Sequence, residues 1–299
     1  MSSKQPIPVR VLPFELVERT VVNLLRIAVT SLPRDVMEAL EESLEKETSP
    51  VAKIQLETIL ENIRLAEDSG APMCQDTGIP LFFLRGHYED GIEEAIRNGV
   101  EIATKEIPLR PNAVHPLTRE NPGTNIGKEI PHLVWNPSME EMIEITVMPK
   151  GAGSENMSRL AMLKPSDGIP GIKKFVLDSV VEAGGKPCPP TIVGVGIGGS
   201  SDIAPQLAKK ALMRPLDVEN PDPMLAELEH ELKEALNATG IGPMGLGGRT
   251  TVLGVKIESA HCHTASLPLA VCLQCWAGRR ACARIYPDGM VSYSREGFD

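Results

Sequence analysis

Aromatic residues and an excess of basic charge are what this sequence most lacks. Phe, Trp and Tyr together make up 3% of the 299 residues, so no platform is evident on which bases or sugars could stack. The formal net charge is -10, and the 30 Lys and Arg residues are scattered along the chain. A negative field without a basic stripe opposes contact with phosphate backbones. We therefore expect no nucleic-acid partner.

Long apolar runs and a secretion signal are also missing. No run approaches the roughly 18 residues of a membrane span, and the opening MSSKQPIPVRVLPFELVERT has no basic stretch followed by an apolar one. With 42% hydrophobic residues the chain can still build a large core. These features predict a cytoplasmic protein that has no membrane partner.

The cysteines argue against a disulfide framework. There are six, at positions 74, 188, 262, 272, 275 and 282. A chain without a secretion signal keeps its thiols reduced. Metal ligands, catalytic thiols and buried free thiols therefore remain as the roles to consider.

The apolar pattern predicts a mixed fold. Helices are expected over 14–30, 33–46 and 50–68, before a region of alternating strands and helices. In that region strands are expected over 79–86, 142–149, 189–199 and 250–260, and helices over 91–107, 171–185, 201–213 and 222–239. Asp222 and Pro223 have the residue types of an N-cap and a first helical position. The sequence predicts a mixed α/β (α+β) fold in one domain, 1–299, with a helical N-terminal preface over 1–70 and a functional α/β region over 71–299.

The stretch GVGIGGS matches a dinucleotide-binding fingerprint only in part. Gly194, Gly196 and Gly199 have the G-x-G-x-x-G spacing between a predicted strand and a predicted helix. The fingerprint also needs an acidic residue after a second strand, and Asp217 and Glu219 lie in a proline-rich link instead. The stretch favours a tight turn that presents backbone N–H groups to an anion. The stretch KGAGSENMS, 150–158, could likewise cradle a carboxylate or form a simple turn.

Residues 258–282 hold most of the remaining metal-ligand types. Cys272 and Cys275 form a C-x-x-C pair, and His261 and His263 lie nearby. A structural zinc site would need two further ligands at regular spacing, which His-x-His does not provide. Cys272 lies within the apolar run PLAVCLQ, where a buried thiol is the simpler interpretation.

Cys74, Cys188 and Cys275 each stand where the backbone is expected to be irregular. Clusters used for electron transfer are held by four cysteines. Three thiolates would leave one iron open for a substrate, by the same logic that separates catalytic from structural zinc. The residues alone do not single out this triple, because any three of the six cysteines could be chosen.

Five motifs in chain order carry a resemblance to a known family. They are APMCQDTG, KGAGSENMSRLAML, KPCPPTIVGVGIGGSSD, GIGPMGLGGRTTVLGV and HCHTASLPLAVCLQCWA. The chain resembles the iron-sulfur hydro-lyases of the class I fumarase and L-tartrate dehydratase type over nearly its whole length. More closely, it is similar to the α subunit of the two-subunit form.

The resemblance implies a 4Fe-4S cluster held by Cys74, Cys188 and Cys275 in the α/β region. The open iron would act as a Lewis acid on the carboxylate and hydroxyl of a small dicarboxylate substrate. Asp76 and His263 match catalytic positions: His263 could protonate the departing hydroxide, and Asp76 could orient the hydroxide or bound water.

The same resemblance implies three substrate-binding residues, Gln75, Arg110 and Gly153. Arg110 would pair with a substrate carboxylate and stabilise an enediolate-like state, a task in which lysine loses the bidentate fork. Arg119 lies close to Arg110 in a looser local motif.

The implied activity is the hydration of fumarate to L-malate, a step of the tricarboxylic acid cycle, by the cluster-bearing α subunit. The alternative within this chemistry is an L-tartrate dehydratase α subunit that forms oxaloacetate, and a different class is a metal- or nucleotide-binding regulatory protein. In the single-chain enzymes further substrate arginines and the proposed general base follow the point where this chain stops, at REGFD. We therefore expect a β subunit, in an α2β2 heterotetramer.

Overall fold

The computed structural model describes residues 13–297, which form two compact units. Unit 1 comprises residues 13–28, 79–149 and 281–297, and unit 2 comprises residues 29–78 and 150–280. Among the described residues, no helix combines the length and the apolarity needed to cross a membrane. The single domain predicted over 1–299 stays a prediction, and the two units are described in turn.

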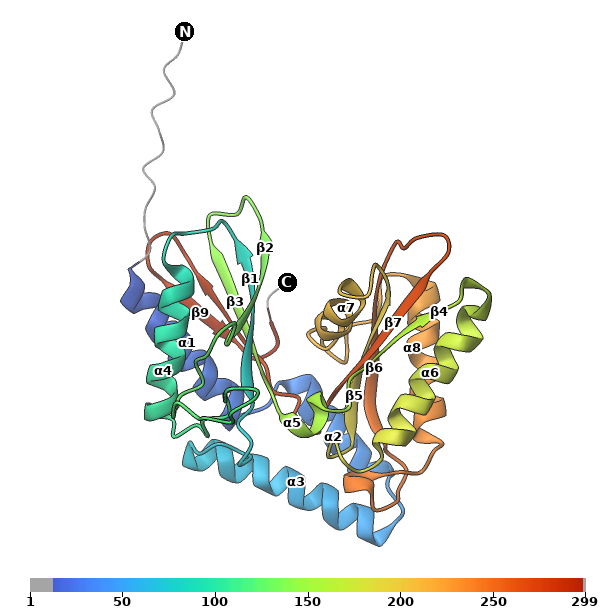
Figure 1. The fold of residues 1–299 in the computed structure, drawn as a ribbon. Helices are drawn as coiled ribbons and strands as arrows, with labels where there is room; N and C mark the ends of the chain where they lie inside the picture. The colour runs from blue at the N-terminus through green and yellow to red at the C-terminus, as the bar shows by residue number, and fades with distance from the viewer. Residues whose placement is uncertain (1–12, 298–299) are drawn as a thin grey trace. The chain divides into compact units, whose positions relative to one another are not determined.

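Unit 1 is built on a five-stranded sheet with strand order β2-β1-β3-β8-β9 (Figure 1). The strands are β1 (Ile79–Gly86), β2 (His132–Pro137), β3 (Ile143–Lys150), β8 (Ala281–Ile285) and β9 (Val291–Ser294). Its helices are α1 (Phe14–Thr30), which continues into unit 2, and α4 (Ile92–Glu106). The two helices approach closely at Gly99, where a Cβ would lie 2.9 Å from the Glu18 carbonyl oxygen.

Unit 2 is built on a four-stranded sheet with order β4-β7-β5-β6. The strands are β4 (Arg159–Leu163), β5 (Thr191–Gly198), β6 (Val252–Ala260) and β7 (Leu267–Gln274). The helices are α2 (Arg34–Lys46), α3 (Pro50–Ser69), α5 (Ala152–Glu155), α6 (Gly168–Ala183), α7 (Ile203–Ala211) and α8 (Pro223–Asn237), with short 3-10 turns at Pro165–Asp167 and Pro243–Gly245. Helices α6 and α8 cover one face of the sheet and α7 the other (Figure 1). The core lies between the sheet and the first pair, where Val176, Val193 and Val271 are fully buried.

The register of β5 and β7 shows which loops of unit 2 lie at the same end of its sheet. The strands are antiparallel, and Ile192 pairs with Gln274 while Ile197 pairs with Leu269. The loop before β5 therefore lies beside the loop after β7, and we call this the cysteine end because Cys188 and Cys275 stand there. The turn after β5 lies beside the turn before β7, and we call this the glycine end because Gly198 and Gly199 stand there.

The structure confirms the predicted fold class and most of the predicted elements. The helical N-terminal segment is present, and α8 begins as expected, with the Asp222 carboxylate accepting a hydrogen bond from the Met224 N–H at 2.9 Å. Ser49 caps α3 in the same way. Five strands, β2, β4, β7, β8 and β9, had not been predicted. Strand β7 is apolar from Leu267 to Leu273 and buried on both faces, so it lacks the alternation that marks a half-buried strand.

The glycines of GVGIGGS serve helix packing. A Cβ at Gly194 would lie 2.2 Å from the Ala208 carbonyl oxygen, and one at Gly196 would lie 2.0 Å from the Ala204 carbonyl oxygen. Only glycine lets α7 approach β5 this closely. Gly199 then turns the chain in the left-handed region, with φ of 69°.

We expect Gly196→Ala to lower the free energy of unfolding by about 3 kcal/mol, because the added methyl group meets a backbone carbonyl that cannot rotate away. Gly127→Ala is the matched control, since the nearest atom to its Cβ is in Ile130 at 4.0 Å. Urea unfolding followed by circular dichroism compares the two. Equal stability of both variants would contradict the packing role of Gly196.

Candidate active site

The loop that carries Cys74 is fixed by hydrogen bonds to two helices. Gly70 ends α3 with φ of 65°, and Asn62 on that helix donates from Nδ2 to the Met73 carbonyl at 2.8 Å. The Met73 N–H donates to the Val29 carbonyl in α1 at 2.9 Å. Cys74, the next residue, is partly buried and is therefore held in place by its neighbour.

Cys188 is held to the segment after β7 by a backbone hydrogen bond. It lies between Pro187 and Pro189 with φ of 56°, a left-handed conformation that costs a non-glycine residue free energy. Its carbonyl accepts from the Trp276 N–H at 3.1 Å. Because Trp276 follows Cys275 directly, this bond brings the two cysteine loops together at the cysteine end.

Burial and neighbouring groups raise the pKa of two of the three thiols. Burial raises the pKa of the Cys188 thiol, and three further groups raise that pKa: Cys275, Cys74 and Asp76. Burial also raises the pKa of the Cys275 thiol, a rise that Arg279 and then Lys150 oppose and Cys74 increases. Thiols that raise one another's pKa would share negative charge on ionisation, and a cationic group bound among them would favour their thiolate forms.

Asp76 is held by two backbone N–H groups and by one arginine side chain. Its Oδ1 accepts from the Gly78 N–H at 3.0 Å, and its Oδ2 accepts from the Ala152 N–H, at the start of α5, at 2.8 Å. Its carbonyl oxygen accepts from Arg279 Nη1 at 2.9 Å. The carboxylate predicted to be catalytic therefore has a fixed orientation beside Cys74, and Gln75 between them is exposed.

The motif KGAGSENMS packs against the cysteine end. Lys150 is buried and donates from Nζ to Ser154 Oγ at 2.8 Å, with Glu155 at 3.3 Å. Burial lowers the pKa of Lys150, and Glu155 opposes that fall. The Ser154 hydroxyl also donates to the Gly151 carbonyl, so its donor is used within the motif and is not offered to a ligand. Gly153 is exposed, and a Cβ there would lie 3.1 Å from the carbonyl of residue 186, close to Cys188.

His263 does not join this group within one chain. It is exposed in the turn before β7, where its Nδ1 accepts from the Ala265 N–H at 3.1 Å. The eight residues of β7 separate it from Cys275, a span of roughly 23 Å for an extended strand. His263 thus lies at the glycine end.

Arg110 belongs to unit 1 and is exposed in the loop after α4. Its carbonyl accepts from Asn125 Nδ2 at 3.2 Å. The alternative, Arg119, lies further along the same loop with φ of 63°. The structure therefore places the predicted carboxylate-binding arginine in a different unit from the cysteines.

The other three cysteines have separate surroundings. Cys272 is buried within β7, as the apolar run predicted. Cys282 is buried in β8 of unit 1, where burial raises the pKa of its thiol to about 12, opposed by a hydrogen bond with Thr146. The Cys262 thiol is exposed at the glycine end and donates to the Ser266 carbonyl at 3.2 Å.

The donor types at the cysteine end are those that the cluster implied by the resemblance would need. Across residues 13–297, no three His, Cys, Asp or Glu side chains converge as ligands of one metal ion. A cubane cluster binds each cysteine through a different iron, so its ligands stand further apart than those of one ion. The donor set here is three partly buried thiols, and beside them Arg279 Nε is buried without a hydrogen-bond partner. An anionic group with sulfur acceptors is what such a site would hold.

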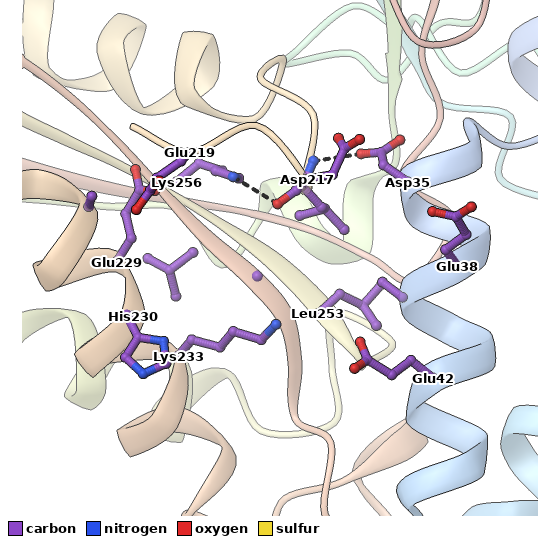
Figure 2. A pocket seen from close by; sticks show the side chains of 15 residues that line it. Asp35, Glu38, Glu42, Asp217, Glu219, Glu229, His230, Lys233, Leu253 and Lys256 are labelled. Carbon is purple, nitrogen blue, oxygen red and sulfur yellow. Dashed lines mark hydrogen bonds between the residues drawn. The ribbon is translucent and has the colours of Figure 1, made fainter. Parts of the chain in front are cut away.

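A separate cavity of about 490 Å³ lies in unit 2, bordered by α2, α8 and β6 (Figure 2). Six carboxylates line it: Asp35, Glu38, Glu42, Asp217, Glu219 and Glu229. Burial lowers the pKa of Lys256 to about 8, and its Nζ donates to the carbonyls of Leu216 at 3.0 Å and Val218 at 2.7 Å. This negative cavity would repel the dicarboxylate expected from the sequence, so it is not the substrate site.

Lys150 and Arg279 were not predicted as site residues. Each follows a stretch of uncharged, mostly apolar residues, TVMP before Lys150 and WAG before Arg279, and a charge at the end of such a stretch is the one signal that could have marked them. Both are nine-tenths or more buried.

Known proteins match nearly the whole chain. The family model for fumarate hydratase (fumerase) matches residues 18–284. A protein of Methanocaldococcus jannaschii, provisionally named an L(+)-tartrate dehydratase subunit alpha, is 54% identical over 279 residues, which cover 91% of this chain and 98% of the relative. The L(+)-tartrate dehydratase subunit alpha of Escherichia coli K12 is 38% identical over 274 residues, 90% of each chain. The protein of that name from Shigella sonnei has the same identity and coverage.

Proposed function

Since the chain belongs to the fumarate hydratase (fumerase) family, we propose that it is the α subunit of a two-subunit iron-sulfur hydro-lyase that converts L-tartrate to oxaloacetate. The observation that supports this substrate is the similarity, at 54% and 38% identity over about nine-tenths of the chain, to proteins named as L(+)-tartrate dehydratase α subunits. The sequence had favoured fumarate, with tartrate second. The names of the relatives reverse that order.

The proposed cofactor is a 4Fe-4S cluster held by Cys74, Cys188 and Cys275. When bound, the cluster supplies a Lewis acid that polarises the carboxylate and hydroxyl of the substrate. The hydrogen bond that joins the Cys188 and Cys275 segments and the buried cations Lys150 and Arg279 support this assignment.

The residues around the cysteines supply orientation. The Asp76 carboxylate, fixed by two backbone N–H groups, can accept a hydrogen bond from the hydroxyl that leaves, with no loss of side-chain freedom on binding. Gln75 is exposed beside it and can bind substrate oxygen. Gly153 leaves room for a substrate against the backbone of α5. Arg110 remains the proposed ligand of a substrate carboxylate.

His263 lies about 23 Å along β7 from Cys275, beyond the reach of one substrate molecule. We therefore propose that His263 serves the cysteine end of a second copy of the chain. This arrangement agrees with an α2β2 enzyme, in which the β subunit supplies the remaining substrate ligands and the general base.

Co-expression with a β subunit without oxygen tests the proposal. We expect about four iron and four acid-labile sulfide per α chain. We also expect a kcat/KM for L-tartrate about tenfold or more above that for fumarate. The polar groups that bind the second hydroxyl of tartrate would have no hydrogen-bond partner when fumarate is bound. A preference for fumarate would overturn the substrate. Protein with neither iron nor labile sulfide would overturn the enzyme assignment and favour a regulatory binding protein.

A further inference from the structure

Arg279 is the largest fully buried side chain described in the chain, with 2% of its surface exposed. Its Nη1 donates to the Asp76 carbonyl at 2.9 Å, and its Nη2 would lie 3.5 Å from a Cβ placed on Gly151. The guanidinium therefore lies between the Cys74 loop and the start of α5. Its Nε is buried and has no hydrogen-bond partner among residues 13–297.

The other buried cations near Arg279 each have a carboxylate partner. Lys150 has Glu155 at 3.3 Å, and Arg280, the next residue, pairs with Asp35 at 2.6 Å. Within residues 13–297 Arg279 forms no salt bridge to a carboxylate. A buried cation without a paired anion costs several kcal/mol, so a further negative group beside Arg279 would stabilise the chain.

Arg279 lies beside two of the cysteine segments. The Ala277 carbonyl accepts from the Cys275 thiol at 3.7 Å and from the Arg279 N–H at 2.7 Å. Arg279 Nη1 also reaches the Asp76 carbonyl, two residues after Cys74. A negative group held by these cysteines would therefore lie beside the guanidinium, in a low-dielectric space where charge and hydrogen bonding act strongly.

We infer that Arg279 is a positioning residue of the active site, which balances the charge of the cluster thiolates and donates its Nε–H to sulfur, while Nη1 holds Asp76. The inference rests on the proposed function, because it needs the cluster. One side chain would then couple the electronic state of the cofactor to the orientation of the carboxylate. Hydrogen bonds to sulfur and nearby positive charge raise the reduction potential of an iron-sulfur cluster, because they stabilise its more negative reduced form.

The test uses the α/β complex, prepared without oxygen, with the variants Arg279→Gln and Arg279→Lys. Arg280→Lys is the control, since Arg280 is equally buried and adjacent but is paired with Asp35. Iron and sulfide content, the midpoint potential from a titration followed by electron paramagnetic resonance, and the rate of iron loss to a chelator are measured on each. Thermal unfolding of each protein is recorded alongside.

We expect Arg279→Gln to shift the midpoint potential downward and to lose iron to the chelator about 10- to 100-fold more readily. Arg279→Lys keeps the charge, so its midpoint potential and its rate of iron loss should lie between those of Arg279→Gln and the wild type. Arg280→Lys should have the midpoint potential of the wild type. If Arg279→Gln does not fold, Arg279→Lys alone carries the comparison. Variants at Arg279 that unfold earlier but keep the wild-type potential would overturn the inference and leave a structural role. Wild-type complex without iron would instead overturn the proposed function, and this inference with it.

Discussion

Replacing Cys188 with serine should leave a folded protein that carries no iron-sulfur cluster and has no measurable turnover. Serine keeps the size of the side chain but replaces the thiolate that holds iron, and two remaining thiols cannot hold a cubane whose open iron must also bind substrate. Loss of the Lewis acid removes several kcal/mol of transition-state stabilisation, a fall of about three orders of magnitude or more in rate. Iron, labile sulfide and turnover of the α/β complex measure the effect.

Cys262→Ser is the control for this prediction. Cys262 is exposed at the glycine end, and its thiol contacts only the turn of its own chain segment in the described residues. It should keep the full iron content and turnover. Loss of iron in Cys262→Ser with retention in Cys188→Ser would show that the three ligands were wrongly assigned.

Replacing His263 with asparagine should leave the iron content unchanged and lower kcat about 10²- to 10⁴-fold, the usual contribution of a general acid. The reason is the role proposed for His263, which lies away from the cysteines of its own chain and would donate the proton at the cysteine end of a second copy. Full activity of His263→Asn, measured with L-tartrate, would remove its role in proton transfer.

Mixing the two inactive variants decides where His263 acts. Complexes that contain one Cys188→Ser chain and one His263→Asn chain can be isolated through two different affinity tags. If His263 serves the second copy, one site combines intact cysteines with an intact histidine, and activity returns to about half of the wild type. If His263 serves its own chain, neither site is complete and the mixed complex stays inactive.

Sequence reasoning predicted helices and strands well where capping residues and the apolar periodicity indicate the same element. Asp222 and Pro223 mark a helix start, as the structure confirms. It failed for β7, whose buried residues give no alternation, and for short strands such as β4, whose existence depends on pairing with β7. Such pairing is set by tertiary structure and leaves little trace in a local window.

The candidate site was predictable in its residues but not in its arrangement. The motifs around Cys74, Cys188 and Cys275 named a ligand set through resemblance, which stays a prediction, and a backbone hydrogen bond joins the segments of Cys188 and Cys275. The separation of His263 from Cys275 could not be foreseen, because it depends on β7 being one straight strand. Arg279 escaped notice because burial of a charge is a property of the folded chain, not of composition.

The segments of unit 2 are interrupted by most of unit 1, since residues 79–149 intervene between its two parts. Cys74 is therefore synthesised well before Cys188, and Cys275 later still, so the three thiols meet only when β5 and β7 have paired across a long loop. The nascent chain has no place to receive a cofactor. The proposed cluster would therefore enter a chain in which folding has already brought its ligand segments together.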